Sequence, residues 1–172
     1  GTHLVTGGNQ AALGGVYKLS AKEENGVYIP TLKISSSYEK TTNPGIKQVY
    51  RFFDKNGQAL ADLVALNDER IETGVNHIFF HPFSTQDMFV MRKNSYAEIR
   101  PLLKKQMENG KRINPSPSLK EIQQNSLELL SHFDKSYKRQ VNPHIYKVSL
   151  STKLKNLKGD LIMQAKMAED KI

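Results

Sequence analysis

The sequence contains no cysteine, which excludes a disulfide framework and any metal site built on thiolates. No apolar run approaches the roughly 20 residues that a membrane-spanning helix requires. The first residues also lack the basic segment followed by an apolar segment that is typical of a secretory signal. We therefore expect a cytoplasmic protein that does not associate with membranes.

Signatures of common catalytic and nucleotide-binding sites are absent as well. The sequence has no Walker loop, no Gly-x-Gly-x-x-Gly, no Gly-x-Ser-x-Gly and no conspicuous pair of carboxylates. His77 and His81 are four residues apart, a spacing that could hold a metal ion on a helix. Pro82 and the aromatic pair between the histidines favour a strand or loop instead, where the two would lie about 13 Å apart. We expect no metal site.

What the sequence does have is the composition of a soluble globular chain with an excess of positive charge. It contains 172 residues, of which 38% are hydrophobic and 24% charged, enough for one domain or two small lobes. The formal net charge of +8 favours anionic partners. The basic residues are spread along the chain, however, which favours a solvated basic surface over a nucleic-acid groove.

Runs of β-prone residues alternate with turn signals up to about residue 93. The predicted strands are residues 16–19, 27–34, 48–53, 59–66, 78–80 and 88–91. Asn25-Gly26 and Asn56-Gly57 each separate two of these runs, a combination that predicts β-hairpins. Residues 94–114 could form a short helix, but Pro101 and the Asn109-Gly110 turn favour a strand that ends at that turn.

The pattern changes to helical after Pro115-Ser116-Pro117, where we place a boundary between a β-rich lobe (1–114) and a helical segment (115–172). Ser118 and Glu121 form a capping box, which predicts a helix running to about Arg139. An extended piece at 146–150 precedes a terminal helix that Gly159 should weaken. Strands first and helices last predict an α+β fold with several antiparallel hairpins and two C-terminal helices.

The first fifteen residues contain five glycines: Gly1, Gly7, Gly8, Gly14 and Gly15. Glycines allow tight turns and let the backbone approach a ligand closely. Backbone N–H groups together with Thr2 and Lys18 would suit a phosphate. A loop with two ordinary turns is the alternative interpretation.

Several blocks of sequence carry a resemblance to a known family. They are Gly-Thr-His-Leu-Val-Thr (1–6), Ala-Leu-Gly-Gly-Val-Tyr-Lys-Leu (12–19), Glu-Lys-Thr-Thr-Asn-Pro-Gly-Ile-Lys-Gln-Val-Tyr-Arg-Phe (39–52), Asn-Gly-Lys-Arg with Ser-Pro-Ser-Leu-Lys-Glu-Ile (109–122) and Asn-Pro-His-Ile-Tyr-Lys-Val-Ser-Leu-Ser (142–151). In this order they resemble bacterial nicotinate phosphoribosyltransferases, over residues 1 to about 155. The block around Pro44-Gly45 is the most specific of them.

The resemblance implies the C-terminal part of an enzyme that makes nicotinate mononucleotide and pyrophosphate from nicotinate and phosphoribosyl pyrophosphate. The reaction is coupled to ATP hydrolysis, with Mg²⁺, and leads to NAD. The family is a type II phosphoribosyltransferase and a homodimer, whose incomplete α/β barrel would lie mostly upstream of this chain. The phosphorylated histidine and the nicotinate-stacking aromatics also lie upstream in the family. We therefore assign no catalytic residue here, and expect the chain alone to be inactive and to bind no cofactor.

Individual residues carry over from the family as follows. Gly1 and Thr2 match the last two residues of a Gly-x-Gly-Thr loop that holds the substrate phosphate. Lys18 matches, more loosely, a basic residue that reaches pyrophosphate across a dimer interface in the related nicotinamide enzyme. Lys47 and Arg51 lie in the most specific block and could equally face anions or form pairs within the β-rich lobe.

Two other interpretations remain open at this point. One is a basic, β-rich nucleic-acid-binding module without enzymatic activity, in which Tyr50, Phe52 and Phe53 would stack on bases. The other is a stand-alone structural or regulatory fragment. In the family, N-terminal strands complete the β-rich lobe, so a chain without them could expose a sheet edge that pairs with a second copy.

Overall fold

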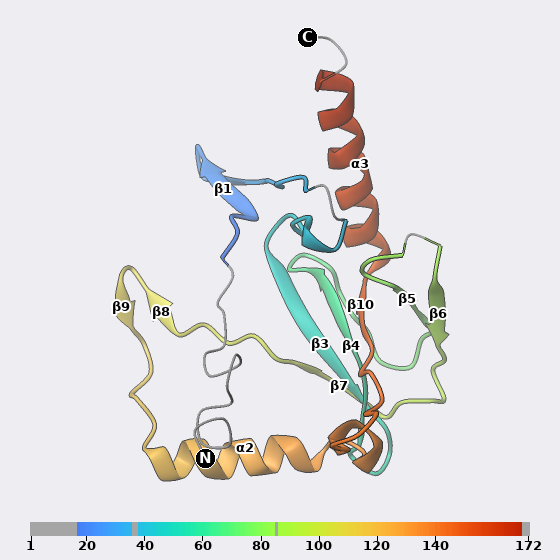
Figure 1. Cartoon of the computed structure of the whole chain (residues 1–172). Helices are drawn as coiled ribbons and strands as arrows, with labels where there is room; N and C mark the ends of the chain where they lie inside the picture. Colours follow the sequence, from blue (N-terminus) through green and yellow to red (C-terminus); the bar gives the residue numbers. More distant parts are fainter. Residues whose placement is uncertain (1–16, 36–37, 85, 170–172) are drawn as a thin grey trace, which may run out of the picture.

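The structure is a computed structural model that describes residues 17–35, 38–84 and 86–169 (Figure 1). The strands are β1 (Ala21–Glu24), β2 (Val27–Pro30), β3 (Lys47–Phe53), β4 (Ala59–Leu66), β5 (His77–Phe80), β6 (Met88–Met91), β7 (Glu98–Pro101), β8 (Met107–Glu108), β9 (Lys111–Arg112) and β10 (Val148–Leu150). The helices are α2 (Leu119–Ser131) and α3 (Thr152–Glu169), with short 3-10 turns η2 (Tyr38–Lys40) and η3 (Lys135–Lys138). The predicted α+β class, with a β-rich region followed by two C-terminal helices, is confirmed.

Six strands form one mixed sheet in the order β6-β5-β10-β4-β3-β7. Every neighbouring pair is antiparallel except β10 and β4, which run parallel. β10 comes from the segment after residue 115 yet lies in the middle of this sheet, between β4 and β5. The division of the chain into lobes 1–114 and 115–172 stays a prediction.

The two predicted hairpins are confirmed, and their Asn-Gly turns explain them. Asn25 and Gly26 both have positive φ, +52° and +78°, as the tight turn between β1 and β2 requires. The turn fixes the register from Glu24↔Val27 outward, so the strand lies at 21–24. The predicted strand at 16–19 is therefore wrong over its described residues, 17–19, which are not in a strand.

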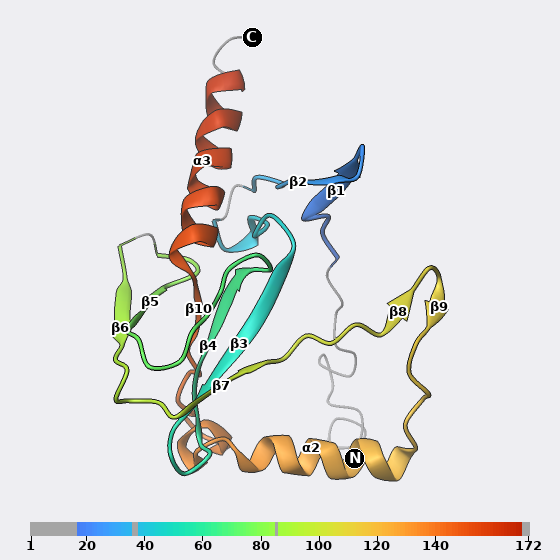
Figure 2. The same cartoon turned by 180° about the vertical axis from the view of Figure 1, so that it is seen from behind.

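The ambiguous region 94–114 contains strands and no helix, as favoured. β7 pairs with β3 at the edge of the main sheet, and β8 and β9 form a small hairpin. Asn109 and Gly110 again take positive φ at its turn. Both views show this hairpin, the β1–β2 hairpin and α2 displaced to the same side of the main sheet (Figures 1 and 2).

The capping box of α2 is confirmed, but the predicted extent of this helix is wrong. The Ser118 side chain accepts from the Glu121 N–H, and the Glu121 carboxylate accepts from the Ser118 N–H at 2.6 Å. The helix ends at Ser131 rather than near Arg139, because the Asp134 side chain accepts from the Ser136 N–H and starts η3. The terminal helix α3 is confirmed and passes through Gly159 without interruption.

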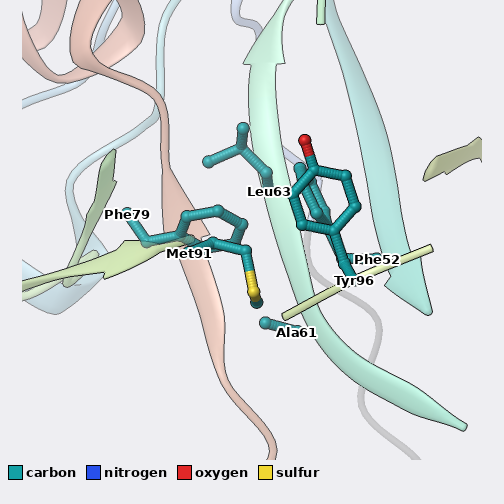
Figure 3. Close-up of a cluster of buried hydrophobic side chains, with 6 residues drawn as sticks. All are labelled: Phe52, Ala61, Leu63, Phe79, Met91 and Tyr96. Carbon is teal, nitrogen blue, oxygen red and sulfur yellow. The ribbon is translucent and has the colours of Figure 1, made fainter. Parts of the chain in front are cut away.

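The larger buried cluster lies on one face of the main sheet (Figure 3). Its members are Phe52, Ala61, Leu63, Phe79, Met91 and Tyr96. The Phe52 ring meets Phe79 and Tyr96 edge-on, with ring centroids 5.1 and 5.0 Å apart. Such pairs add roughly 0.5–1.5 kcal/mol to the burial of their surfaces. Phe52 and Phe53 are 0% and 2% exposed, so neither is available to stack on a base.

A smaller cluster seats α3 on the sheet. Leu154 of α3 is buried with Leu66 of β4 and Leu150 of β10, and Leu157 packs against them. β10 leads into α3 through Ser151 alone, and the helix continues from the end of the strand (Figure 2). Among the described residues, no helix is both long and apolar enough to cross a membrane.

Candidate anion-binding site

The structure brings together two of the predicted site residues, Lys18 and Lys47. Both line a pocket of about 380 Å³. The lining residues are Lys18, Ser20, Glu39, Lys40, Thr41, Thr42, Asn43 and Lys47. Gly1 and Thr2, the predicted phosphate loop, lie outside the described residues. The pocket is built from the segment before β1, from η2 and the loop after it, and from the first residue of β3.

Backbone hydrogen bonds hold the loop of this pocket in place. Thr42 donates its N–H to the Lys33 carbonyl at 3.4 Å and accepts the Lys33 N–H on its hydroxyl at 3.3 Å. The Gly45 N–H donates to the Ser20 carbonyl at 2.7 Å. Thr41 and Thr42 are buried, so the loop is part of the folded structure rather than a surface excursion. These bonds fix Thr41, Thr42 and Asn43 between two lysine-bearing segments.

Gly45 is required by the geometry of this loop. Its φ is +84°, a conformation that residues with a Cβ adopt at a cost. A Cβ on Gly45 would also lie 2.8 Å from Leu66 Cδ2, too close for carbon atoms. The turn at Asn43-Pro44-Gly45 therefore packs closely against the core residue Leu66, shortly before β3 begins.

Two lysines of the pocket donate hydrogen bonds to backbone carbonyl groups. The Lys18 ammonium donates to the Lys40 carbonyl, and the Lys47 ammonium donates to the Gly45 carbonyl. Partial burial lowers the pKa of Lys47, because the charged form is poorly solvated there. Glu39 is the acidic member of the lining, against three lysines. Ammonium groups with nearby hydroxyls suit an oxyanion such as a phosphate.

A fourth lysine, from α3, lies next to this loop. Lys158 is 1% exposed, and its ammonium donates to Asn43 Oδ1 at 2.9 Å. Burial, and then the positive charge of Lys18, lower the pKa of Lys158. Lys158 was not among the residues predicted for the site. The available signal was its position: Lys158 is four residues after Leu154 and so falls on the apolar face of the helix.

Arg51 does not line the pocket. It forms a pair within the β-rich region, which was one of the two alternatives given for it. Its Nε and Nη2 donate to the two carboxylate oxygens of Asp62, both at 2.8 Å. Tyr146 donates its hydroxyl to Asp62 Oδ1 at 2.9 Å, and the Phe133 ring lies 4.8 Å from the guanidinium. The hydrogen bond to Asp62 raises the pKa of Arg51, and burial raises that of Tyr146.

The histidine pair is not arranged as a metal site. His77 lies in β5, where its Nε2 contacts the Glu72 carbonyl at 2.8 Å. His81 Nδ1 accepts from the N–H groups of Phe83 and Ser84 at 3.2 and 3.0 Å. In the part of the chain that the structure describes, no group of three or more His, Asp or Glu side chains could hold a metal ion.

A larger pocket, of about 620 Å³, lies beside β5, β6 and β10. Its walls are mostly apolar and include Phe79, Phe89 and Val148. Among the predicted site residues that are described, none lines it. Its size exceeds that of the lysine pocket, but the lysine pocket has the charge and the hydroxyl groups that the predicted chemistry requires.

Comparison with known proteins identifies the family. The family model described as "Nicotinate phosphoribosyltransferase C-terminal domain" matches residues 46–158. The nicotinate phosphoribosyltransferase of Bacillus subtilis (strain 168) is 39% identical over 155 residues, which cover 88% of this chain and 30% of that protein. The protein of the same name from Caenorhabditis elegans is 38% identical over 156 residues, covering 90% and 26%.

A solved structure agrees with these matches. The crystal structure of human nicotinic acid phosphoribosyltransferase has a TM-score of 0.61 and 28% identity to this chain, covering 69% of this chain and 23% of that one. The chain thus spans less than a third of the length of these relatives. Lys47, Arg51 and Lys158 fall inside the matched residues 46–158. The chain therefore belongs to the family of nicotinate phosphoribosyltransferase C-terminal domains.

Proposed function

We propose that the protein carrying this domain condenses nicotinate with phosphoribosyl pyrophosphate, forming nicotinate mononucleotide and pyrophosphate. The reaction uses ATP and Mg²⁺ and supplies NAD synthesis, in a cytoplasmic homodimer. The support is the name shared by relatives that match about nine-tenths of the chain. In this proposal, nicotinate, phosphoribosyl pyrophosphate and ATP bind mainly to the barrel, which is formed by residues upstream of those in this chain.

The domain contributes anion contacts to that reaction. The observation that carries this proposal is the convergence of Lys18, Lys47 and the Thr41-Thr42 pair on one pocket. The ammonium and hydroxyl donors of this pocket would hold a phosphate or pyrophosphate group of the reactants. Gly1 and Thr2 are proposed to hold the substrate 5′-phosphate through a backbone N–H and a hydroxyl.

The proposal for the whole protein predicts that the chain alone has no turnover. Correct positioning of reactants can contribute about 7–11 kcal/mol to a reaction, and it requires the barrel. The purified chain is incubated with nicotinate, phosphoribosyl pyrophosphate, ATP and Mg²⁺, and nicotinate mononucleotide is quantified by chromatography. No product is expected; formation of product by the chain alone would overturn the proposed division of roles.

The anion contacts are tested by titrating the chain with inorganic pyrophosphate at constant ionic strength, by calorimetry and amide NMR. We expect saturable binding, with the largest shifts at Thr41, Thr42 and Lys47. Lys47→Gln should weaken it by about tenfold to a hundredfold, the loss of one charge-assisted contact of roughly 1.5–3 kcal/mol. Lys111→Gln in the exposed β8–β9 hairpin is the matched control. Equal losses in the two variants would mean that net charge, not the pocket, attracts the anion.

A further inference from the structure

The larger pocket, of about 620 Å³, has the size of a small-molecule site, for which volumes of about 300–1,000 Å³ are usual. On one side it is lined by β5, β6 and the loop between them, and on the other by the segment that leads into β10. Most of its lining is apolar, with a few polar side chains, which is the usual composition of such sites. The proposed function gives this pocket no role.

Hydrogen bonds fix both walls of this pocket. Across the β5–β6 loop, the His81 N–H donates to the Asp87 carbonyl at 2.9 Å. On the other side, the Asp62 N–H donates to the Lys147 carbonyl at 2.9 Å, and the Tyr146 hydroxyl donates to Asp62 Oδ1 at the same distance. A pocket whose walls are already fixed loses little conformational freedom when a ligand binds.

One wall of the pocket is aromatic and carries a positive charge. The rings of Phe79 and Phe89 lie with their centroids 4.8 Å apart and their planes at 34°, and both residues line the pocket. The Lys147 ammonium lies 4.6 Å from the centroid of the Phe89 ring. Among the described residues, no carboxylate forms an ion pair with Lys147. A flat aromatic ligand packed against this wall would therefore lie beside an ammonium group.

His81 gives the pocket a second hydrogen-bond donor. Its Nδ1 accepts from the N–H groups of Phe83 and Ser84, so this nitrogen carries no proton. The neutral ring then carries its proton on Nε2, which is a donor. An ammonium group and a ring N–H together suit a carboxylate. Asp87 is the acidic member of the lining and opposes a second negative charge, which provides a test of the charge of the ligand.

We propose that this pocket binds a small aromatic carboxylate. The ring of the ligand packs against Phe79 and Phe89, and its carboxylate accepts from the Lys147 ammonium and from His81 Nε2. The inference does not depend on the proposed function, because Lys18, Lys40 and Lys47 of the lysine pocket do not line this one.

The test titrates naphthoate into the full 172-residue chain at constant ionic strength, followed by calorimetry and amide NMR. Naphthoate joins two fused aromatic rings to one carboxylate. We expect saturable binding, with the largest amide shifts at Phe89 and Val148. Naphthylmethylammonium, which has the same rings and the opposite charge, should bind about tenfold more weakly, because it loses the charge-assisted contact with Lys147.

Variants separate the contribution of charge from that of the aromatic wall. Lys147→Gln should weaken naphthoate binding by about threefold to tenfold, between the effects of exposed and of buried charge contacts. Lys93→Gln removes the same charge from an exposed lysine that does not line the pocket, and should match the unchanged chain. Asp87→Asn removes the like charge and should strengthen binding. Phe89→Leu should weaken binding of both naphthoate and its cationic analogue, because it removes an aromatic ring from the wall.

Several outcomes would overturn the inference. They are no binding of naphthoate by a folded chain, equal affinity for naphthoate and its cationic analogue, and equal losses in Lys147→Gln and Lys93→Gln. Amide shifts confined to residues far from the pocket would overturn it as well. Lys147 and Asp87 are exposed, so their variants still carry the test if Phe89→Leu unfolds the chain. Pyrophosphate binding is measured in a separate titration, so a failure of either pocket leaves the result for the other unchanged.

Discussion

Arg51 on β3 and Asp62 on β4 are register partners and form a two-pronged salt bridge, with both N···O distances at 2.8 Å. Their side chains are 14% and 8% exposed, so water screens the pair only weakly. Tyr146 adds a third hydrogen bond from the segment before β10. Through Tyr146, the pair therefore links the segment before β10 to the β3–β4 hairpin.

Removing one partner of this pair should destabilise the fold strongly. Arg51→Met leaves the Asp62 carboxylate buried and unpaired, which typically costs about 3–5 kcal/mol. Urea unfolding followed by circular dichroism measures the free energy of unfolding. The double variant Arg51→Met with Asp62→Leu should recover much of the lost stability, because no unpaired charge is then buried. Glu98→Gln, at the exposed pair with Arg100, should cost less than about 1 kcal/mol; a similar loss at both sites would contradict the role of burial.

Gly45→Ala should destabilise the pocket loop and the core behind it. Positive φ alone costs a non-glycine residue about 1–2 kcal/mol, and the approach to Leu66 Cδ2 adds to this. Gly110→Ala is the matched control, since Gly110 has φ +72° with open space around its Cβ position. Thermal unfolding of both variants separates strain from the clash. The account of Gly45 is wrong if the two variants lose the same stability.

Because of Lys47, the stability of the chain should vary with pH in the alkaline range. Burial lowers its folded pKa below the ordinary value of 10.5, so between these values the unfolded chain binds more protons. Its contribution to stability is unfavourable at neutral pH and is relieved as pH rises through the folded pKa. Lys47→Met should therefore gain most over the unchanged chain at neutral pH, and the gain should shrink toward pH 10.5. Urea titrations across this range measure it; a gain independent of pH would contradict the cause assigned.

The apolar face of α2 should drive self-association of the chain. Ile122, Leu129 and Leu130 share one side of the helix and are 49%, 43% and 50% exposed. Exposed apolar patches of this kind mark contact surfaces. Light scattering over a concentration series should show association, which Ile122→Glu reduces. Gln124→Glu makes the same charge change on the opposite side of α2 and should have no effect, and a monomer at all concentrations would contradict the prediction.

Features that depend on neighbouring residues were predictable from the sequence. The Asn25-Gly26 and Asn109-Gly110 turns require positive φ that few other pairs tolerate, so the hairpins follow from the turn residues alone. The capping box at Ser118 is a similarly local signal. The end of α2 was missed because Phe133 continues the helical spacing, yet its ring packs against Tyr146 with centroids 5.0 Å apart.

Features that depend on distant residues were not predictable in the same way. Lys18 and Lys47 were selected separately, the first through a loose family match, and only the fold places them on one pocket. Lys158 was not predicted to belong to the site, because sequence spacing cannot show that Asn43 lies opposite it. The partner of Arg51 is across a strand pair, so its two alternatives could not be separated before the register was known.

The central position of β10 also sets the order in which the chain can fold. The contact between Tyr146 and Asp62 spans 84 residues, and β10 joins β4 to β5 inside the sheet. During synthesis, β3 and β4 can pair as soon as they emerge, but the β5–β6 hairpin has no sheet neighbour until β10 has been made. Pairing over such long separations is slow, and open strand edges invite aggregation in the interval. The β4 edge is therefore where nascent chains are most exposed to misassembly, and shortening the chain before Val148 would leave that edge permanently open.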